Sequence, residues 1–396
     1  MKVSAFLGIN NRLSDEHLTT PEDGNFLRDA VNVDVTDAKR LRLRKGFKLA
    51  IPGEYAHSVW SDGGDSFYVD NGTLYRLREE ASGVARDVVR TGLAPSHTLS
   101  YARSNGEVVF SNGLVIERIV GTATAPLVYP APNPAPTARL VTSGSLPESV
   151  YIFCFAYVDA AGAVGLGSPV FSLRGGGGIE FDIPAPPQGM LTRVYVSSPG
   201  DDVPQHLVDS AGGTVLYALP EWTGAPCPTL HKQALPPGRI VREFNGRLCS
   251  AVGDTLYYSD AYHQGVMAST NYIPFPEEIT IFEPCDNGAF LVADRTYWLS
   301  GPDISKAEVV PVNDRKASFG SATRLKSGGV VWFSSVGLVK GTKDGMVQEI
   351  MDDKVEVEMP AVAATLHRSF DGIRQFVASG AHRPGFGAVG CFMDAE

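Results

Sequence analysis

The chain has 396 residues, enough for about two or three hydrophobic cores, and its 43% hydrophobic content is ordinary for a folded protein. Its 42 glycines and 27 prolines, with few extended helical patterns, predict an all-β fold of short strands and tight turns. Because Asp and Glu outnumber Lys and Arg by 44 to 34, the net charge of −10 argues against a domain that binds nucleic acid through its phosphates.

Residues 1–53 are predicted to form an extended N-terminal arm. In its basic run the cations alternate with Leu41 and Leu43, which is the period of a strand with one apolar and one charged face. One interpretation is a solvated edge strand whose charges prevent aggregation. The other is an assembly interface with an acidic protein, or a contact with phosphate, made by Arg40, Arg42, Arg44 and Lys45.

Hairpin patterns recur through residues 54–130 and 233–396. Each contains Asn-Gly or Asp-Gly, which supply the positive φ angles of a two-residue turn, between alternating apolar residues. Clear examples are Asn71-Gly72, Asn105-Gly106, Asn245-Gly246, Asn287-Gly288, Asp344-Gly345 and Asp371-Gly372. Hairpins repeated every few tens of residues predict the blades of a β-propeller, here six-bladed, with the first blades in 54–130 and the remaining blades in 233–396.

Residues 137–232 are predicted to be a β-sandwich inserted between the blades. Proline-rich stretches flank this segment, as stiff linkers do. Strand patterns such as Val150 to Val158 follow one another at sandwich spacing, and Tyr157 to Ser168 resembles the strand, turn and G-x-x-S return of a fibronectin type III or immunoglobulin-like module. Gly175 to Gly178 precedes a strand rather than a helix, so it is expected to be a flexible loop and not a phosphate cradle.

No catalytic or metal-binding pattern is present in the sequence. The five cysteines are widely spaced, without a C-x-x-C pair, and are expected to be buried free thiols. Carboxylates that are adjacent or two residues apart are typical of solvated loops, not of a glycosidase pair across a pocket; these are Glu277, Glu278, Asp352, Asp353, Glu356 and Glu358. We therefore expect no enzymatic activity, no cofactor and no metal. No apolar run approaches the ~20 residues of a membrane span.

Three phrases of the arm are Gly8-Ile9-Asn10-Asn11-Arg12, residues 27–34 (LRDAVNVD) and residues 41–47 (LRLRKGF). They resemble the opening of tail tube or nozzle proteins of short-tailed bacteriophages, where an extended arm precedes the first propeller blade. Residues 256–275, 314–320 and 332–338 resemble blade phrases of the same family.

This resemblance implies a structural virion protein, the tail nozzle or packaged-DNA stabilisation protein. Six copies would form a ring below the portal and its adaptor, retain the packaged DNA, and contact tail spikes, fibres or a tail needle. The ring would be assembled in the cytoplasm of the host bacterium and become part of the virion tail. Since genomic DNA must pass during ejection without tight binding, we expect an acidic channel lining made by the loop carboxylates named above.

Two other classes of function remain open. A carbohydrate- or receptor-binding phage tail adhesin is one, because fibronectin-like modules and aromatic-rich blades also serve that role. A propeller glycosidase or lyase is the other, and it would need convergent carboxylates at one mouth of the propeller. The number of subunits separates a nozzle ring of six from a fibre of three.

Overall fold

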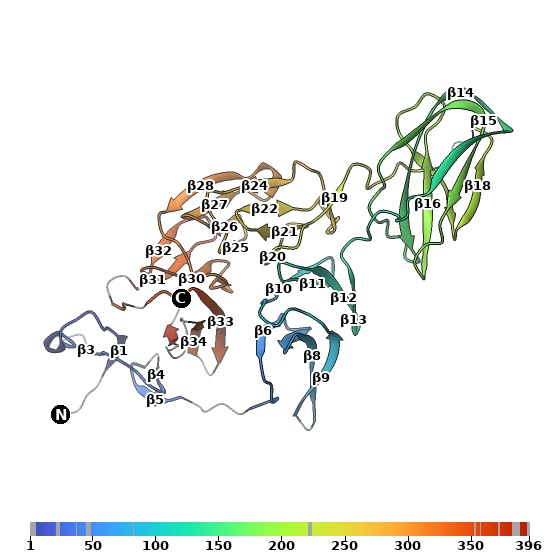
Figure 1. Cartoon of the computed structure of the whole chain (residues 1–396). Helices are drawn as coiled ribbons and strands as arrows, with labels where there is room; N and C mark the ends of the chain where they lie inside the picture. Colours follow the sequence, from blue (N-terminus) through green and yellow to red (C-terminus); the bar gives the residue numbers. More distant parts are fainter. Residues whose placement is uncertain are drawn as a thin grey trace. The chain divides into compact units, whose positions relative to one another are not determined.

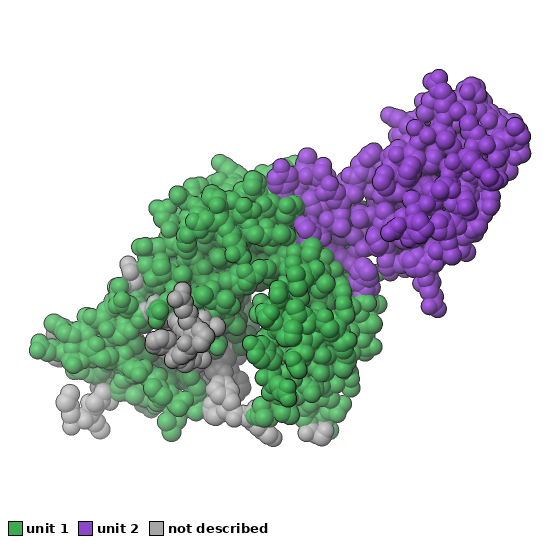
Figure 2. Space-filling model, viewed as in Figure 1, with its two compact units in different colours: residues 1–124, 237–257, 273–396 green, residues 125–236, 258–272 purple. Residues whose placement is uncertain are grey.

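The sequence forms an all-β chain in the computed structural model, which describes residues 5–20, 24–36, 38–44, 49–81, 83–220, 224–351, 354–356, 358–370, 373–381 and 389–393. Two compact units are present, shown in different colours in Figure 2. Unit 1 comprises residues 1–124, 237–257 and 273–396, and unit 2 comprises residues 125–236 and 258–272. Within the described ranges, the helices are short 3-10 turns at Asp15–His17 and Ile304–Lys306, and none is long and apolar enough to cross a membrane.

Antiparallel sheets follow one another along the chain (Figure 1). The first four-stranded sheet contains β6 Ala56–Ser61, β7 Ser66–Asp70, β8 Thr73–Glu80 and β9 Gly83–Arg90. The second contains β10 Ser100–Ser104, β11 Glu107–Ser111, β12 Ile116–Val120 and β13 Ala123–Pro126. The third contains β20 Ile240–Phe244, β21 Arg247–Val252, β22 Thr255–Tyr258 and β24 Tyr272–Pro274.

The series continues to the C-terminal region. The fourth sheet contains β25 Ile281–Pro284, β26 Gly288–Val292, β27 Thr296–Ser300 and β28 Glu308–Asn313. The fifth contains β29 Thr323–Arg324, β30 Val330–Ser334, β31 Gly337–Gly341 and β32 Val347–Glu349. The sixth is three-stranded in the described residues, with β33 Val362–Phe370, β34 Ile373–Ala381 and β35 Val389–Met393.

Neighbouring sheets are joined through their first strands at a regular interval along the chain. The Leu99 N–H donates to Ser58 Oγ, 41 residues earlier, and Arg242 Nε donates to Glu283, again 41 residues away. The hydroxyls of Thr323 and Thr365, 42 residues apart, join β29 to β33. One four-stranded sheet for every ~40 residues is consistent with a β-propeller-like fold.

The second and third sheets are joined in the same way, but over a longer stretch of sequence. The Val241 N–H donates to Ser100 Oγ, 141 residues earlier. This separation exceeds the usual interval by about 100 residues, because most of unit 2 lies between these two sheets in the sequence.

The hydrophobic core lies between the faces of successive sheets. All five residues of β30 are buried, and they alternate between two neighbours. Trp332 packs at 5.3 Å from the ring of Phe290 in the fourth sheet, whereas Phe333 packs at 6.0 Å from Phe376 in the sixth. A strand buried on both faces needs a continuous apolar run, which explains the sequence Val-Val-Trp-Phe.

Three of the Asn-Gly turns have the geometry that the sequence predicts, whereas Asn287-Gly288 has a positive φ at neither residue and Asp344-Gly345 has one only at the glycine. Asn71 and Gly72 have φ angles of 46° and 73°, and the pairs at Asn105 and Asn245 are similar. Positive φ at both positions defines a type I′ turn, which matches the twist of the flanking strands. These three hairpin predictions are confirmed, whereas Asp371-Gly372 lies outside the described residues.

The N-terminal arm has two small sheets of its own. One has the order β1–β3–β2 and the other is a hairpin; their strands are β1 Phe6–Ile9, β2 Thr19–Thr20, β3 Gly24–Leu27, β4 Val33–Val35 and β5 Leu41–Leu43. The Phe6 N–H donates to Lys39 O at 2.9 Å, so the three-stranded sheet and the hairpin are connected.

Unit 2 contains a five-stranded antiparallel sheet in the order β17–β16–β14–β15–β18. Its strands are β14 Thr137–Asp159, β15 Phe171–Ile183, β16 Met190–Val196, β17 Gln205–Ser210 and β18 Gly213–Tyr217. The aromatic rings of Phe153, Phe155 and Phe181 lie in one buried cluster. Unit 2 also contains a two-stranded ladder between β19 Gln233–Ala234 and β23 Val266–Met267.

Gly175 to Gly178 is part of β15, so the expectation of a flexible loop there is wrong. Gly175, Gly177 and Gly178 pair with the bulged middle of β14, where the two backbones approach closely. A Cβ atom on Gly178 would lie 2.2 Å from Ser143 O, and one on Gly176 would lie 2.9 Å from Leu146 O. Glycine is therefore required where the strand pair bends, and it does not mark flexibility here.

Candidate functional site

The hairpin β4–β5 of the arm has an apolar face and a polar face. Its register places Val33 opposite Leu43, Asp34 opposite Arg42, and Val35 opposite Leu41. Opposed residues of a strand pair share a face, so Val33, Val35, Leu41 and Leu43 form one face, which we call the arm's apolar face. It is directed outward, because Leu43 is 78% exposed and Leu41 39% exposed, whereas Asp34 is only 7% exposed.

The cations of the predicted assembly interface differ in their surroundings. Arg44 Nε lies 3.2 Å from Asp34 Oδ1, and both side chains are largely buried. Arg42 Nε is buried with no hydrogen-bond partner among the described residues. Arg40 is exposed, and Lys45 lies outside the described residues. The alternation of cations and leucines is thus that of a strand, with Arg42 and Arg44 less exposed than Leu43.

Asn10 and Asn11 position the arm. Asn10 Oδ1 accepts hydrogen bonds from the N–H groups of Arg12 and Leu13, which forms a tight turn. The Asn11 N–H then donates to Lys354 O at 3.1 Å, and its side-chain amide bonds both backbone groups of Glu356, at 2.8 and 2.9 Å. The arm is therefore fixed to the segment that follows β32.

The loop carboxylates expected to line a channel are only partly free. Lys316 Nζ lies 2.5 Å from Glu277, and Arg239 Nη1 lies 2.7 Å from Glu278. Both ion pairs are about half-exposed, so each carboxylate is close to charge-balanced at the surface. Glu356 and Glu358 are exposed, and Asp352 and Asp353 lie outside the described residues.

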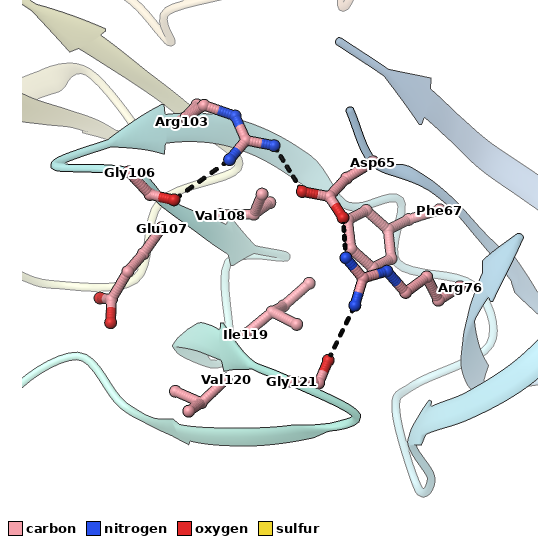
Figure 3. Close-up of a pocket in the computed structure, with 10 residues that line it drawn as sticks. All are labelled: Asp65, Phe67, Arg76, Arg103, Gly106, Glu107, Val108, Ile119, Val120 and Gly121. Atoms are coloured by element: carbon pink, nitrogen blue, oxygen red, sulfur yellow. Dashed lines mark hydrogen bonds and ion pairs between the residues drawn. The ribbon is translucent and has the colours of Figure 1, made fainter. Parts of the chain in front are cut away.

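A pocket of about 340 Å³ lies between the first and second sheets (Figure 3). Its apolar part is formed by Phe67, Val108, Ile119 and Val120, and its polar part by Asp65, Arg76, Arg103, Glu107 and the carbonyls of Gly106 and Gly121. Arg76 spans the pocket wall, since it pairs with Asp65 and donates to Gly121 O at 3.3 Å.

Arg103 connects the two sheets beside this pocket. Its guanidinium pairs with Asp62 and Asp65 of the β6–β7 turn, the latter at 2.5 Å, and donates to Gly106 O at 3.1 Å. Hydrogen bonds from Arg103 lower the pKa of both Asp62 and Asp65, so both stay ionised at neutral pH. No pattern in the sequence identified this ionic contact, because Arg103 lies on a separate strand from Asp62 and Asp65.

Two later pairs of neighbouring sheets are joined by hydrogen bonds between their turns. Asn245 Nδ2 donates to Pro302 O at 2.8 Å, and Asn287 Nδ2 donates to Asp344 at 2.7 Å; each pair is 57 residues apart. In both, the first turn of one sheet bonds the last turn of the next. Between the first and second sheets the same position is occupied by the pocket, with Arg76 and Arg103 reaching across it.

Among the described residues, no three His, Cys, Asp or Glu side chains gather as metal ligands would. Sequence comparison gives no further assignment, because no family model and no curated protein matches the chain.

Solved structures show distant similarity only. The crystal structure of BBS1N in complex with ARL6DN is 12% identical, with 88% of this chain and 96% of that chain covered at a TM-score of 0.34. The extracellular domain of the putative one component system BT4673 from B. thetaiotaomicron is 10% identical, covering 84% of this chain and 60% of that one (TM-score 0.27). Apo AztD from Citrobacter koseri is 12% identical, covering 80% and 90% (TM-score 0.25). These values assign no function.

Proposed function

We propose that this chain is a structural subunit of the tail nozzle of a short-tailed bacteriophage, a packaged-DNA stabilisation protein that assembles as a homohexamer. In this proposal it is a six-bladed β-propeller with a fibronectin III-like β-sandwich inserted between the second and third blades. The ring binds the portal-adaptor complex on one side and tail spikes, fibres or a needle on the other. It forms in the host cytoplasm, remains in the virion tail, and acts as a conduit rather than an enzyme.

The arm's apolar face is the observation that carries this proposal. A two-stranded hairpin is marginally stable alone in water, and one that exposes leucines gains stability when another surface covers them. Val31 and Leu49, which flank the hairpin in sequence, are also more than 70% exposed. The resemblance of the arm's phrases to those of nozzle proteins falls on this same segment.

Charge balance is compatible with the passage of DNA. Lys316 and Arg239 are neutralised by Glu277 and Glu278, so neither is a free cation that would hold phosphates. Free cations in the channel would form many contacts with DNA phosphates, and these contacts would have to break during ejection. Weak contacts allow the DNA to slide.

The subunit number tests the proposal. The purified chain is examined by native mass spectrometry and negative-stain electron microscopy, alone and mixed with the portal and adaptor of the same virus. Six-fold rings seated on the adaptor are the expected result. A stable trimer, or a chain that stays monomeric and unbound in the mixture, would contradict the nozzle.

A carbohydrate-binding adhesin is the second candidate, and the pocket between the first and second sheets favours it. The charged groups of the pocket pair with one another, which suits a neutral polyhydroxylated ligand. The apolar side chains of Phe67 and Ile119 can pack against the face of a sugar ring. Saturation-transfer NMR with bacterial surface oligosaccharides tests this, with Val120→Trp to fill the mouth. Oligosaccharide binding that is lost in this variant would favour the adhesin. If the wild-type chain binds none of the oligosaccharides, the adhesin hypothesis is excluded.

A further inference from the structure

Two cysteines that are distant in sequence lie together in the core of unit 2. Cys154 is in β14, and Cys227 is in the segment whose Pro226 bridges to Gln205 of β17. With Ala156 and Tyr195 they form one buried cluster. Cys154 is fully buried and Cys227 is 7% exposed. Nothing in the proposed nozzle function uses this pair.

The two thiols lie close enough to affect each other's ionisation. The neighbouring Cys154 lowers the pKa of Cys227, and the neighbouring Cys227 raises the pKa of Cys154. Cys227 Sγ also lies 3.7 Å from Thr229 Oγ1, and that hydroxyl donates to Gly165 O at 2.7 Å. These contacts restrict the Cys227 side chain within the buried cluster that also contains Cys154.

The backbone holds both cysteines independently of their sulfur atoms. β14 is the central strand of its sheet, paired on both sides. On the other side, the Cys227 N–H donates to Pro204 O at 3.3 Å and the His206 N–H donates to Ala225 O at 3.1 Å, which fixes the segment against β17. The backbone contacts of these two segments therefore place the two thiols near each other.

We propose that Cys154 and Cys227 are a redox pair, which a small-molecule disulfide such as glutathione disulfide oxidises to an intramolecular disulfide bond. The more exposed Cys227 loses its proton and attacks one sulfur of the oxidant, which forms a mixed disulfide and expels one glutathione thiolate. Cys154 then loses its proton and attacks the Cys227 sulfur, which expels the second. The two protons go to the two leaving thiolates, so two protein thiols are oxidised and one glutathione disulfide is reduced to two glutathiones.

Two of the other cysteines provide internal controls. Cys249 and Cys285 are buried in unit 1 in separate places, and burial raises the pKa of each, to about 12 for Cys285. A buried thiol without a second thiol beside it stays reduced under mild oxidation. Selectivity for the 154–227 pair is therefore part of the proposal.

The bond has a structural consequence for unit 2. It joins the segment of Cys227 to the central strand β14 and closes a long loop of the chain. Cross-linking a long loop restricts the unfolded chain, so the oxidised form is expected to unfold at a higher temperature than the reduced form.

The test is a redox titration of the full chain. The protein is equilibrated in glutathione buffers of increasing oxidised fraction, quenched with acid, alkylated and mapped by peptide mass spectrometry. The expected product is a single linked peptide pair containing Cys154 and Cys227, two hydrogen masses lighter than the reduced pair. Cys154→Ser and Cys227→Ser should each abolish it, whereas Cys249→Ser and Cys285→Ser should leave it unchanged.

Slow access to the buried sulfurs must not be mistaken for lack of pairing. The same series is therefore also run on chain unfolded in urea and refolded in each buffer, and the unfolding temperature is measured for both products. A linked 154–227 peptide and a raised unfolding temperature, reversed by reduced glutathione, support the proposal. Free, alkylatable Cys154 and Cys227 in both series, or links to Cys249 or Cys285 instead, would overturn it.

Discussion

The side-chain amide of Asn11 bonds the backbone N–H and C=O of Glu356, although 345 residues separate them. Asparagine suits this position because its amide presents one donor and one acceptor side by side, as a neighbouring strand would. The N-terminal arm is therefore held by a side chain that imitates backbone pairing. Any partner that binds the arm acts on a segment fixed to the later sheets of unit 1.

Replacing Asn11 with Leu keeps the branched shape of the side chain and removes both of its hydrogen bonds to Glu356. Since the bonded groups are near the surface, the free energy of unfolding should fall by only about 1 kcal/mol. The Glu356 amide, which donates to Asn11 Oδ1, should exchange with solvent faster, as hydrogen–deuterium exchange would measure. Gln348→Leu, at an exposed position of β32, is the control and should change neither quantity. Unchanged exchange at Glu356 would show that the two hydrogen bonds of the Asn11 side chain do not form in solution.

The double variant Leu41→Asp, Leu43→Asp places charges on the arm's apolar face. The monomer should keep its stability to within about 0.5 kcal/mol, because the side chains are solvent-exposed, but ring assembly should be lost. Native mass spectrometry measures the subunit number. Leu114→Asp is the matched control, at a turn leucine that is 58% exposed. Rings formed equally well by both variants would mean that the face is not an interface.

Local patterns in the sequence were sufficient for some features and insufficient for others. The turn at Asn71-Gly72 follows from two adjacent residues, and it was predicted correctly. The alternation around Arg42 predicts a strand, but a period of two does not say which face is buried; here Asp34, on the partner strand, holds Arg44 on the less exposed side. The meeting of Cys154 with Cys227 depends on sheet order, which no local pattern encodes.

Gly178→Ala tests why four glycines lie within β15. The new methyl group would meet Ser143 O at 2.2 Å, so β14 or β15 must shift, and we expect a loss of about 1–3 kcal/mol in the stability of unit 2. Urea unfolding followed by near-ultraviolet circular dichroism measures this loss. Gly64→Ala is the control, because the nearest heavy atoms to its Cβ are 3.9 and 4.0 Å away. Equal stability of the two variants would mean that the close approach at Gly178 relaxes without cost.

Acidification should weaken the ionic contact between the first and second sheets. Folding lowers the pKa of Asp62 and Asp65. The stability that these two carboxylates contribute is therefore fully present above their unfolded pKa of about 4. It is lost as the pH falls through their lower folded pKa. Arg103→Gln should therefore unfold at lower urea than the wild type at pH 7, with the difference shrinking below about pH 4. Arg139→Gln, which breaks an exposed pair with Glu180, is expected to show almost no difference at either pH. A gap between Arg103→Gln and wild type that stays constant with pH would contradict this account.

The variant Glu277→Gln, Glu278→Gln tests whether paired carboxylates keep the surface from binding DNA. The wild-type chain should not retain double-stranded DNA at physiological salt, because its net charge is −10 and Lys316 and Arg239 are already paired. Removing both carboxylates frees two neighbouring cations and should produce weak retention that falls steeply as salt rises. Glu148→Gln, Glu308→Gln makes the same change in net charge at exposed carboxylates for which no ion pair is found among the described residues. This control separates a local effect from a general one, and fluorescence anisotropy with a labelled duplex at several salt concentrations measures both. Tight, salt-sensitive binding by the wild type would argue against a conduit through which DNA slides.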